Sequence, residues 1–301
     1  MTADRPLLGI SLMLCFCAIV PLSDGLAKLL GDTIPLIQLL LVRFTAQWIL
    51  LLPVILATAR PMRTSRRIAW LIALRTTYFM VGMAAMFTAL RFLPLADAVA
   101  IAFVAPVILL LLGRFVLDEH VGPRRLTACV VGFGGTLLVI QPSFEHVGWP
   151  ALLPVVVAVV LALYMLVSRQ LAKDYDPLSL QATTGMMATA FLVLVFFIDG
   201  GRTAALQLKI PDLADGLLLV ALGVVGTVAH VLMTWSLRYA PSATLAPMQY
   251  LEIPFTTLVG WLFFHDLPGG VAALGIVIIV ASGLYIVYRE RRTAELVPPE
   301  A

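Results

Sequence analysis

The sequence contains little charge. Asp, Glu, Lys and Arg make up 12% of its 301 residues, about half of the roughly 25% that is usual in soluble domains. Hydrophobic residues account for 61%, and the mean hydropathy is +1.02. So few polar residues cannot cover a water-exposed surface. An ordinary soluble domain is therefore excluded, and the lipid bilayer is the expected surroundings of the chain.

Alternation of apolar and polar residues is also missing. In hydrocarbon every backbone N–H and C=O must be bonded internally, so only helices and closed barrels span a membrane. Barrel strands alternate with a period of two, whereas the apolar runs here are continuous, for example 137–140 and 217–225. This pattern predicts an all-α integral membrane protein.

Motifs of enzymes and of metal sites are absent as well. The sequence has no His-Glu-x-x-His pair, no nucleophile elbow and no phosphate-binding loop. The Gly132-Phe133-Gly134-Gly135 stretch lies inside an apolar run with no preceding strand, so it predicts close helix packing. We therefore expect no catalysis, no cofactor, no metal and no nucleic-acid partner. The histidines without ligand spacing are His120, His146, His230 and His265, and the cysteines, all in apolar runs, are Cys15, Cys17 and Cys129.

Ten apolar stretches are long enough to cross a membrane, since a spanning helix needs roughly 20 residues for a ~30 Å core. Clusters of Pro, Gly and charged residues separate them. The predicted spans are 7–30, 34–58, 68–90, 94–116, 124–141, 149–170, 177–198, 213–237, 242–264 and 269–288.

Basic residues favour one side of the predicted bundle. With the N-terminus placed in the cytoplasm, fourteen Lys and Arg residues fall in cytoplasmic segments and four in external ones (Lys28, Arg91, Arg202 and Lys209). This bias follows the positive-inside rule. It predicts a bacterial inner-membrane protein with both termini, including a short C-terminal tail, in the cytoplasm.

The sequence repeats itself. Residues 89–94 (ALRFLP) resemble residues 236–241 (SLRYAP), and after a slip of one residue Pro106 falls on Pro254 and Asp118 on Asp266. This register predicts two five-helix units, residues 1–145 and 146–301. Because five is odd, the second unit must be inverted relative to the first. Inverted repeats are common in secondary transporters, whose substrate site lies near mid-membrane between the halves.

Charged side chains occur within the spans at Asp24, Arg43, Arg75 and Glu252. They are costly in hydrocarbon and usually face a cavity, a partner or a water path. On a rise of ~1.5 Å per residue, Asp24 and Arg43 lie about 9–14 Å below the same surface, so they form either an ion pair or part of a site. Asp24 or Glu252 could also accept a coupling proton. Asp97, three residues after Pro94, fits an ordinary helix N-terminus equally well.

Aromatic and amide side chains form a second group of candidate substrate contacts, suited to stacking and hydrogen bonding with a ring-bearing solute. Prolines inside spans predict kinks that free carbonyl groups. The aromatic and amide candidates are Gln47, Tyr78, Tyr164, His230, Trp235, Gln249 and Tyr250, and the kink candidates are Pro21, Pro106 and Pro254.

The chain resembles the drug/metabolite transporter superfamily, EamA type. Residues 115–120 (FVLDEH), followed by 132–140, resemble the "GE…G…LI" signature of that family, with Asp118 in place of the usual Gly and no Glu in the second copy at His265-Asp266. Other stretches resemble the branch that includes bacterial S-adenosylmethionine and riboflavin uptake carriers. These stretches are Ser23-Asp24 with Lys28, Val42-Arg43-Phe44, Leu74-Arg75, and Ala246-Pro247 with Tyr250-Leu251-Glu252.

The resemblance implies a secondary transporter for a small organic metabolite, working as a monomer or homodimer in the bilayer. Two alternatives stay open at this point. One is an exporter of amino acids, drugs or a metallophore, and the other is an intramembrane lipid-modifying enzyme.

Overall fold

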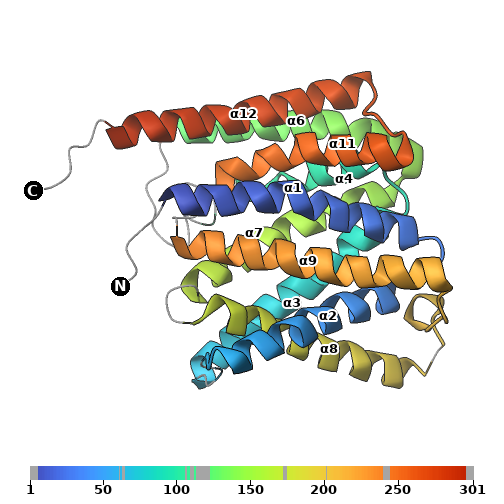
Figure 1. The fold of residues 1–301 in the computed structure, drawn as a ribbon. Coiled ribbons are helices and arrows are strands. Elements are labelled where there is room, and N and C mark those ends of the chain that lie inside the picture. Colours follow the sequence, from blue (N-terminus) through green and yellow to red (C-terminus); the bar gives the residue numbers. More distant parts are fainter. Residues whose placement is uncertain are drawn as a thin grey trace, which may run out of the picture.

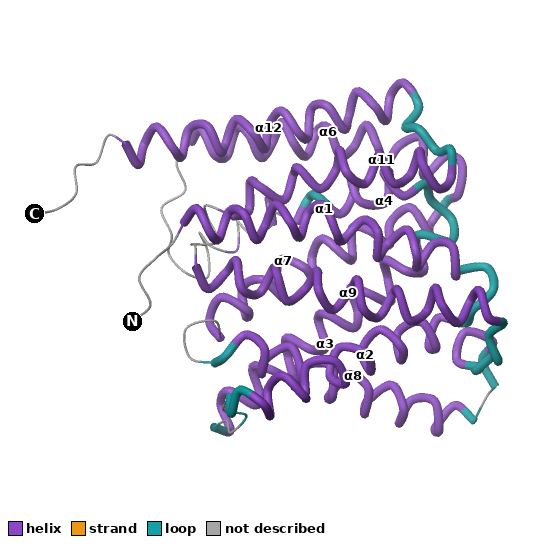
Figure 2. Tube along the Cα trace, viewed as in Figure 1, coloured by secondary structure: helices purple, strands orange, loops and turns teal. Residues whose placement is uncertain are grey.

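A computed structural model describes residues 6–60, 62, 65–105, 107–108, 112, 123–171, 175–200, 202–239 and 245–295. Within these residues the chain forms ten α-helices and short 3-10 segments, without strands (Figures 1 and 2). The helices of the first half are α1 (Pro6–Leu30), α2 (Leu36–Ala57), α3 (Arg66–Ala89), α4 (Leu95–Ala102) and α6 (Pro123–Val147). Those of the second half are α7 (Leu153–Leu171, preceded by η1, Trp149–Leu152), α8 (Pro177–Asp199), α9 (Leu213–Tyr239), α11 (Glu252–Phe264, preceded by η3, Ala246–Leu251) and α12 (Gly270–Glu295). A further 3-10 turn, η2 (Ala204–Leu206), lies between α8 and α9.

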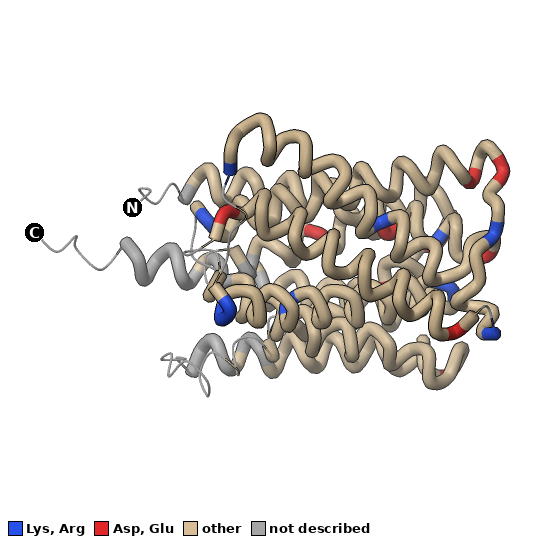
Figure 3. Tube along the Cα trace, turned by 90° about the horizontal axis from the view of Figure 1, so that it is seen from below, with Lys and Arg blue, Asp and Glu red and all other residues tan. Residues whose placement is uncertain are grey.

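The protein is an all-α membrane bundle, and the ten helices in the described part of the chain fall within or overlap the ten predicted spans. Six of them are long and apolar enough to cross a bilayer by themselves: 7–30, 36–57, 66–89, 149–168, 177–199 and 213–239. Figure 3 shows that charged residues gather at the two ends of the bundle and are sparse between them. The predicted ends of two spans were wrong, because α6 continues to Val147 and α12 to Glu295.

The helix α1 begins, and α12 ends, at the same end of the bundle (Figure 1). We call this the Pro6 end, and the opposite end, which contains the last turn of α1, the Lys28 end. An even number of crossings requires this arrangement.

The longest helix contacts all join one half of the chain to the other. The helix α1 packs along α9, α3 along α7, α2 along α8, and α6 along α12. The first five helices correspond in order to the second five. Exchanging the halves therefore converts the α1–α9 pair into the α7–α3 pair and leaves the other two pairs unchanged. This exchange symmetry is that of two inverted five-helix repeats.

The α6–α12 pair depends on glycine. A Cβ atom on Gly135 would lie 2.8 Å from the carbonyl oxygen of Gly275, and one on Gly132 would lie 2.8 Å from the Ser282 hydroxyl. Only glycine allows the two backbones to approach so closely. The glycine-rich stretch thus packs helices, as the sequence predicts.

The fourth and ninth spans are each interrupted. The helix α4 ends at Ala102 and is followed by a turn at Phe103 and Val104, whereas η3 changes to α11 between Leu251 and Glu252. The two interruptions are 148 residues apart, which is the register of the repeat.

Prolines account for these interruptions. A proline has no N–H for the carbonyl four residues earlier and clashes with it. Pro106 lies outside the described residues, but α4 ends four positions before it. Pro254 lies in the first turn of α11, where no N–H partner is needed, and the span is interrupted just before it. Pro21 lies within α1, which continues through it without a break.

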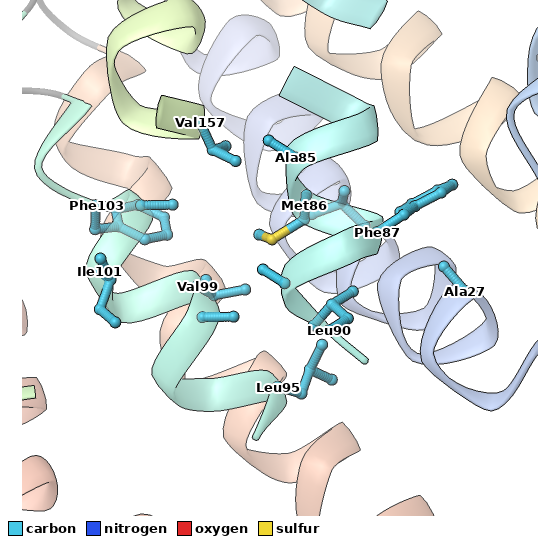
Figure 4. Close-up of a cluster of buried hydrophobic side chains, with 14 of the residues drawn as sticks. Ala27, Ala85, Met86, Phe87, Leu90, Leu95, Val99, Ile101, Phe103 and Val157 are labelled. Atoms are coloured by element: carbon cyan, nitrogen blue, oxygen red, sulfur yellow. The ribbon is translucent and has the colours of Figure 1, made fainter. Parts of the chain in front are cut away.

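Part of the buried apolar core packs around the link between α3 and α4, at the Lys28 end of the bundle (Figure 4). Leu90 and Leu95, on either side of the α3–α4 link, are 1% and 0% exposed. Met86 and Val99 belong to the same cluster and lie nearer the middle of the bundle. Leu90 and Leu95 lie on the Lys28 side of the space described next, which Met86 and Val99 line.

Candidate functional site

A cavity lies at the middle depth of the bundle. It contains about 920 Å³ of space not filled by protein atoms, counting the part that is open to the outside. Its lining comes from α1, α3 and α4 of the first half, and from α7, α9, η3 and α11 of the second. On α1 the lining runs from Phe16 to Asp24, near the centre of that helix. The site is therefore shared by both repeats near mid-membrane.

Six of the eleven predicted contact residues line this cavity. They are Asp24, Tyr78, Tyr164, His230, Gln249 and Glu252. The structure brings them together from α1, α3, α7, α9, η3 and α11, so residues more than 220 positions apart face one space.

The other five predicted residues lie outside the cavity lining. Arg43, Gln47 and Arg75 are completely buried between helices. Trp235 packs with apolar residues of α2 and α8, and Tyr250 stacks on Phe103 with ring centroids 5.4 Å apart.

Sequence analysis overlooked the apolar lining. Phe79, Gly82, Met83 and Met86 follow Tyr78 along one face of α3, with the i, i+4 and i+8 spacing of a helix stripe. Phe16, Phe103 and Met233 line the cavity from α1, the end of α4 and α9. The stripe on α3 was the signal in the sequence, but the same spacing also describes an ordinary packed face.

Arg43 does not form the ion pair with Asp24 that was one of our two predictions. Among the described ion pairs none joins these side chains, and Arg43 donates instead to Gln47 Oε1 at 3.1 Å and to the Gly226 carbonyl at 2.7 Å. Gln47 donates in turn to the Gln181 side chain at 2.8 Å. The guanidinium thus links α2 to α9. It can approach the backbone of Gly226 because that residue has no side chain.

The hydrogen bonds continue towards the cavity. Gln181 donates to the His230 carbonyl at 3.0 Å and to Thr234 Oγ1 at 2.5 Å. Since His230 lines the cavity, a network of neutral acceptors supports this wall from behind.

Arg75 supports the neighbouring wall. Its guanidinium donates to Ser168 Oγ at 2.7 Å, to Thr184 Oγ1 at 2.8 Å and to the Tyr164 hydroxyl, and it lies 4.4 Å from the centre of the Tyr164 ring. These contacts join α3 to α7 and α8. Arg75 therefore positions Tyr164 rather than touching the cavity itself.

Aromatic rings form a continuous surface on this side of the cavity. The Phe79 ring lies 4.6 Å from His230 and 5.2 Å from Tyr164, measured between ring centroids. Phe16 reaches His230 edge-on at 6.0 Å. We call Phe16, Phe79, Tyr164 and His230 the aromatic wall.

Two carboxylates also line the cavity, one from α1 and one from α11. Asp24 on α1 is 7% exposed, and Glu252 begins α11. Among the described residues, neither side chain has a hydrogen-bond or ion-pair partner. Asp97, by contrast, lies outside the lining and accepts a hydrogen bond from Ser143 at 3.3 Å. We call Asp24 and Glu252 the acidic pair.

An ion pair joins the two halves at the Lys28 end. Lys28 Nζ at the end of α1 lies 2.9 Å from Asp266 Oδ2 in the link between α11 and α12. The same ammonium donates to the Leu93 carbonyl at 3.1 Å and lies 4.7 Å from the centre of the Phe264 ring. The described residues contain no group of three or more His, Cys, Asp or Glu that could hold a metal ion.

Two inverted helical repeats around a mid-depth cavity define a multi-pass secondary transporter for a small molecule. The chain belongs to the EamA-like transporter family, whose sequence pattern matches residues 7–141 and 148–288.

The chain is similar to a riboflavin transporter of Rhizobium johnstonii, with 30% identity over 74% of this chain and 72% of the relative. It is also 25% identical to an S-adenosylmethionine uptake transporter of Rickettsia bellii, over 90% of each chain. A solved crystal structure with 19% identity has the same fold, with a TM-score of 0.69 over 97% of this chain and 100% of the other.

Proposed function

We propose that this transporter carries a ring-bearing organic metabolite through the central cavity by alternating access, with residues 1–145 and 146–301 rocking against each other. The observation that carries the proposal is the lining of one mid-depth cavity by both repeats. A relative motion of the repeats would expose such a cavity to either side of the membrane.

Names of relatives and the chemistry of the lining agree on the type of solute. The relatives are named for riboflavin and for S-adenosylmethionine, both of which contain a planar ring. The aromatic wall offers stacking surfaces, and Gln249 and Tyr78 offer hydrogen bonds. Export of amino acids, drugs or a metallophore is the alternative within the same class.

The membrane placement follows from the charge bias. We propose a bacterial inner-membrane location with the Pro6 end in the cytoplasm, where the basic residues gather. Asp24 or Glu252 is the proposed acceptor of a coupling proton, and a monomer or homodimer is the proposed working unit.

Flux into proteoliposomes tests the carrier function. The purified protein is reconstituted, and uptake of radiolabelled riboflavin, S-adenosylmethionine and amino acids is measured with and without a proton gradient. We expect saturable uptake of one class of solute, abolished in Glu252→Gln and unchanged in the matched variant Glu145→Gln, whose side chain is exposed on α6.

Absence of flux for the whole panel in protein that remains folded would refute a carrier. Mass spectrometry of the vesicle lipids covers the enzyme alternative, because chemically altered lipids would identify a lipid-modifying enzyme.

A further inference from the structure

We infer that the cavity selects an organic cation that carries a planar ring, rather than a neutral ring compound. The inference rests on the proposed carrier function and concerns the substrate class of the same site. Its basis is that the acidic pair and the aromatic wall line the same cavity.

The acidic pair gives the cavity two carboxyl groups that, among the described residues, form no ion pair and no hydrogen bond. Asp24 is 7% exposed and Glu252 is partly buried, and neither side chain has a hydrogen bond or ion pair among the described residues. A buried charge that lacks a partner is strongly unfavourable. A positive group on the solute would supply the missing partner for both carboxylates.

Neither buried arginine forms an ion pair with these carboxylates, although Arg43 is close enough to Asp24 for the two charges to interact. Arg43 and Arg75 lie outside the lining, and each makes its described hydrogen bonds to neutral acceptors. They lie behind the aromatic wall, with Arg43 6.0 Å from the centre of the Phe79 ring and Arg75 4.4 Å from that of Tyr164. The two carboxylates therefore line the cavity, whereas the two guanidinium groups lie outside its lining.

The remaining lining suits a soft organic cation. Phe103 and the aromatic wall present ring faces and edges, and Met83, Met86 and Met233 add thioether groups. Aromatic faces attract alkylated ammonium or sulfonium groups, and methionine adapts to irregular ligands. A metal ion or a bare proton would need none of this apolar surface.

The interruption of α4 adds to the preference of the cavity for a cation. Ala102, the last residue of α4, and Phe103, its C-cap, both line the cavity. The carbonyl end of a helix carries a partial negative charge that favours cations. The carbonyl end of α4 and the acidic pair thus both favour a cationic ligand.

Hydrogen-bond donors orient the ring. Tyr78 and Tyr164 bring hydroxyl groups to the cavity, and His230 Nδ1 is buried without a hydrogen-bond partner among the described residues. A ring with acceptor atoms would meet these groups at the aromatic wall, while the cationic part of the same solute would lie beside Asp24 and Glu252.

Four probes separate the contributions of charge and ring. S-adenosylmethionine has both a ring and a sulfonium, adenosine has the same ring without a charge, choline has a quaternary ammonium without a ring, and riboflavin has a larger neutral ring. Dissociation constants are measured by calorimetry on the purified full chain, and flux is measured in proteoliposomes for the probes that bind. We expect S-adenosylmethionine to bind at least about tenfold more tightly than the other three, a difference of about 1.4 kcal/mol.

Variants then test the assigned groups. Asp24→Asn and Glu252→Gln should each remove most of the advantage of S-adenosylmethionine over adenosine, whereas Glu145→Gln should keep it. Adenosine affinity serves as the check that each variant still folds, because the ring contacts are unchanged.

The possible failures are distinguishable. Equal affinity for adenosine and S-adenosylmethionine, tighter binding of riboflavin, or an unchanged preference in both variants would overturn the cation inference while leaving the carrier function intact. Tight binding of the cation without any flux would contradict the carrier function and leave the substrate class standing.

Discussion

The ion pair between Lys28 and Asp266 offers a direct test of alternating access. It connects the end of α1 in the first half to the α11–α12 link in the second half. The same Lys28 ammonium also donates a hydrogen bond to the Leu93 carbonyl, in the link between α3 and α4 and beside the buried Leu90 and Leu95 (Figure 4). When the cavity opens towards the Lys28 end, these contacts must separate. Lys28→Met should therefore favour the open form.

The size of the expected shift towards the open form follows from how exposed the Lys28 and Asp266 side chains are. The two side chains are 17% and 38% exposed, so the pair resembles a surface salt bridge worth about 0.2–1 kcal/mol. A hydrogen bond from a charged donor is worth about 1.5–3 kcal/mol when buried, and less at this partly exposed site. We take about 1–2 kcal/mol in total, which changes a two-state population about 5- to 30-fold.

Thiol labelling measures this shift. In a background without Cys15, Cys17 and Cys129, Ser23→Cys places a thiol at the cavity wall on α1. We expect a membrane-impermeant reagent added on the Lys28 side to label it about 5- to 30-fold faster in Lys28→Met, within the range just derived. Asp266→Asn should give a smaller rise.

The control variant is Arg202→Met, at an exposed position in the link between α8 and α9. It removes a positive charge at the same end without touching the ion pair, so labelling should stay at the starting rate. Unchanged labelling in both Lys28→Met and Asp266→Asn would show that the ion pair does not hold this end closed.

Two further predictions concern the buried arginines. Arg75→Lys should lower transport about tenfold with normal membrane insertion, because an ammonium does not reproduce the planar fork of five donors that holds Tyr164 and its neighbours. Tyr164→Phe should lower the initial uptake rate to a similar extent. A normal uptake rate in Arg75→Lys together with a reduced rate in Tyr164→Phe would contradict the positioning role of Arg75. Asp24→Asn and Arg43→Gln should have non-additive effects on thermal stability, because the two buried charges interact although no hydrogen bond joins them. Effects that add within about 0.5 kcal/mol would show that the two charges do not interact.

Most of the fold was predictable because the bilayer imposes a simple rule. Continuous apolar runs must become helices of known length, and an odd number of helices per repeat requires inversion. The details at helix ends were less predictable. The extension of α6 to Val147 crosses Pro142, a residue that usually ends a helix, yet the helix continues through it. The polar residues beyond the apolar run carried no signal of membrane depth.

The site was predictable only in part, because the polarity of a residue within a span does not reveal whether its side chain faces the cavity or a neighbouring helix. Glu252 and Arg75 are both charged and both fall within spans, but Glu252 faces the cavity and Arg75 faces hydroxyl groups on α7 and α8. Those acceptors, Ser168 and Thr184, lie more than 90 residues from Arg75 in the sequence. A single sequence contains no record of which hydroxyl meets which guanidinium, so a cavity residue and a packing residue look alike in it.

Comparison of the two repeats explains how one cavity acquires two different sides. Both repeats are interrupted at equivalent positions, with Val104 in the first corresponding to Glu252 in the second. The duplicated backbone therefore supplies two similar helix interruptions beside the cavity, but only the second one carries a carboxylate. A perfectly repeated sequence would place equal groups on both sides and would bind a solute in either of two orientations. Because Glu252 faces the cavity while Val104 does not, an asymmetric solute has one favoured orientation, which is what a carrier needs to distinguish a cationic group from a ring.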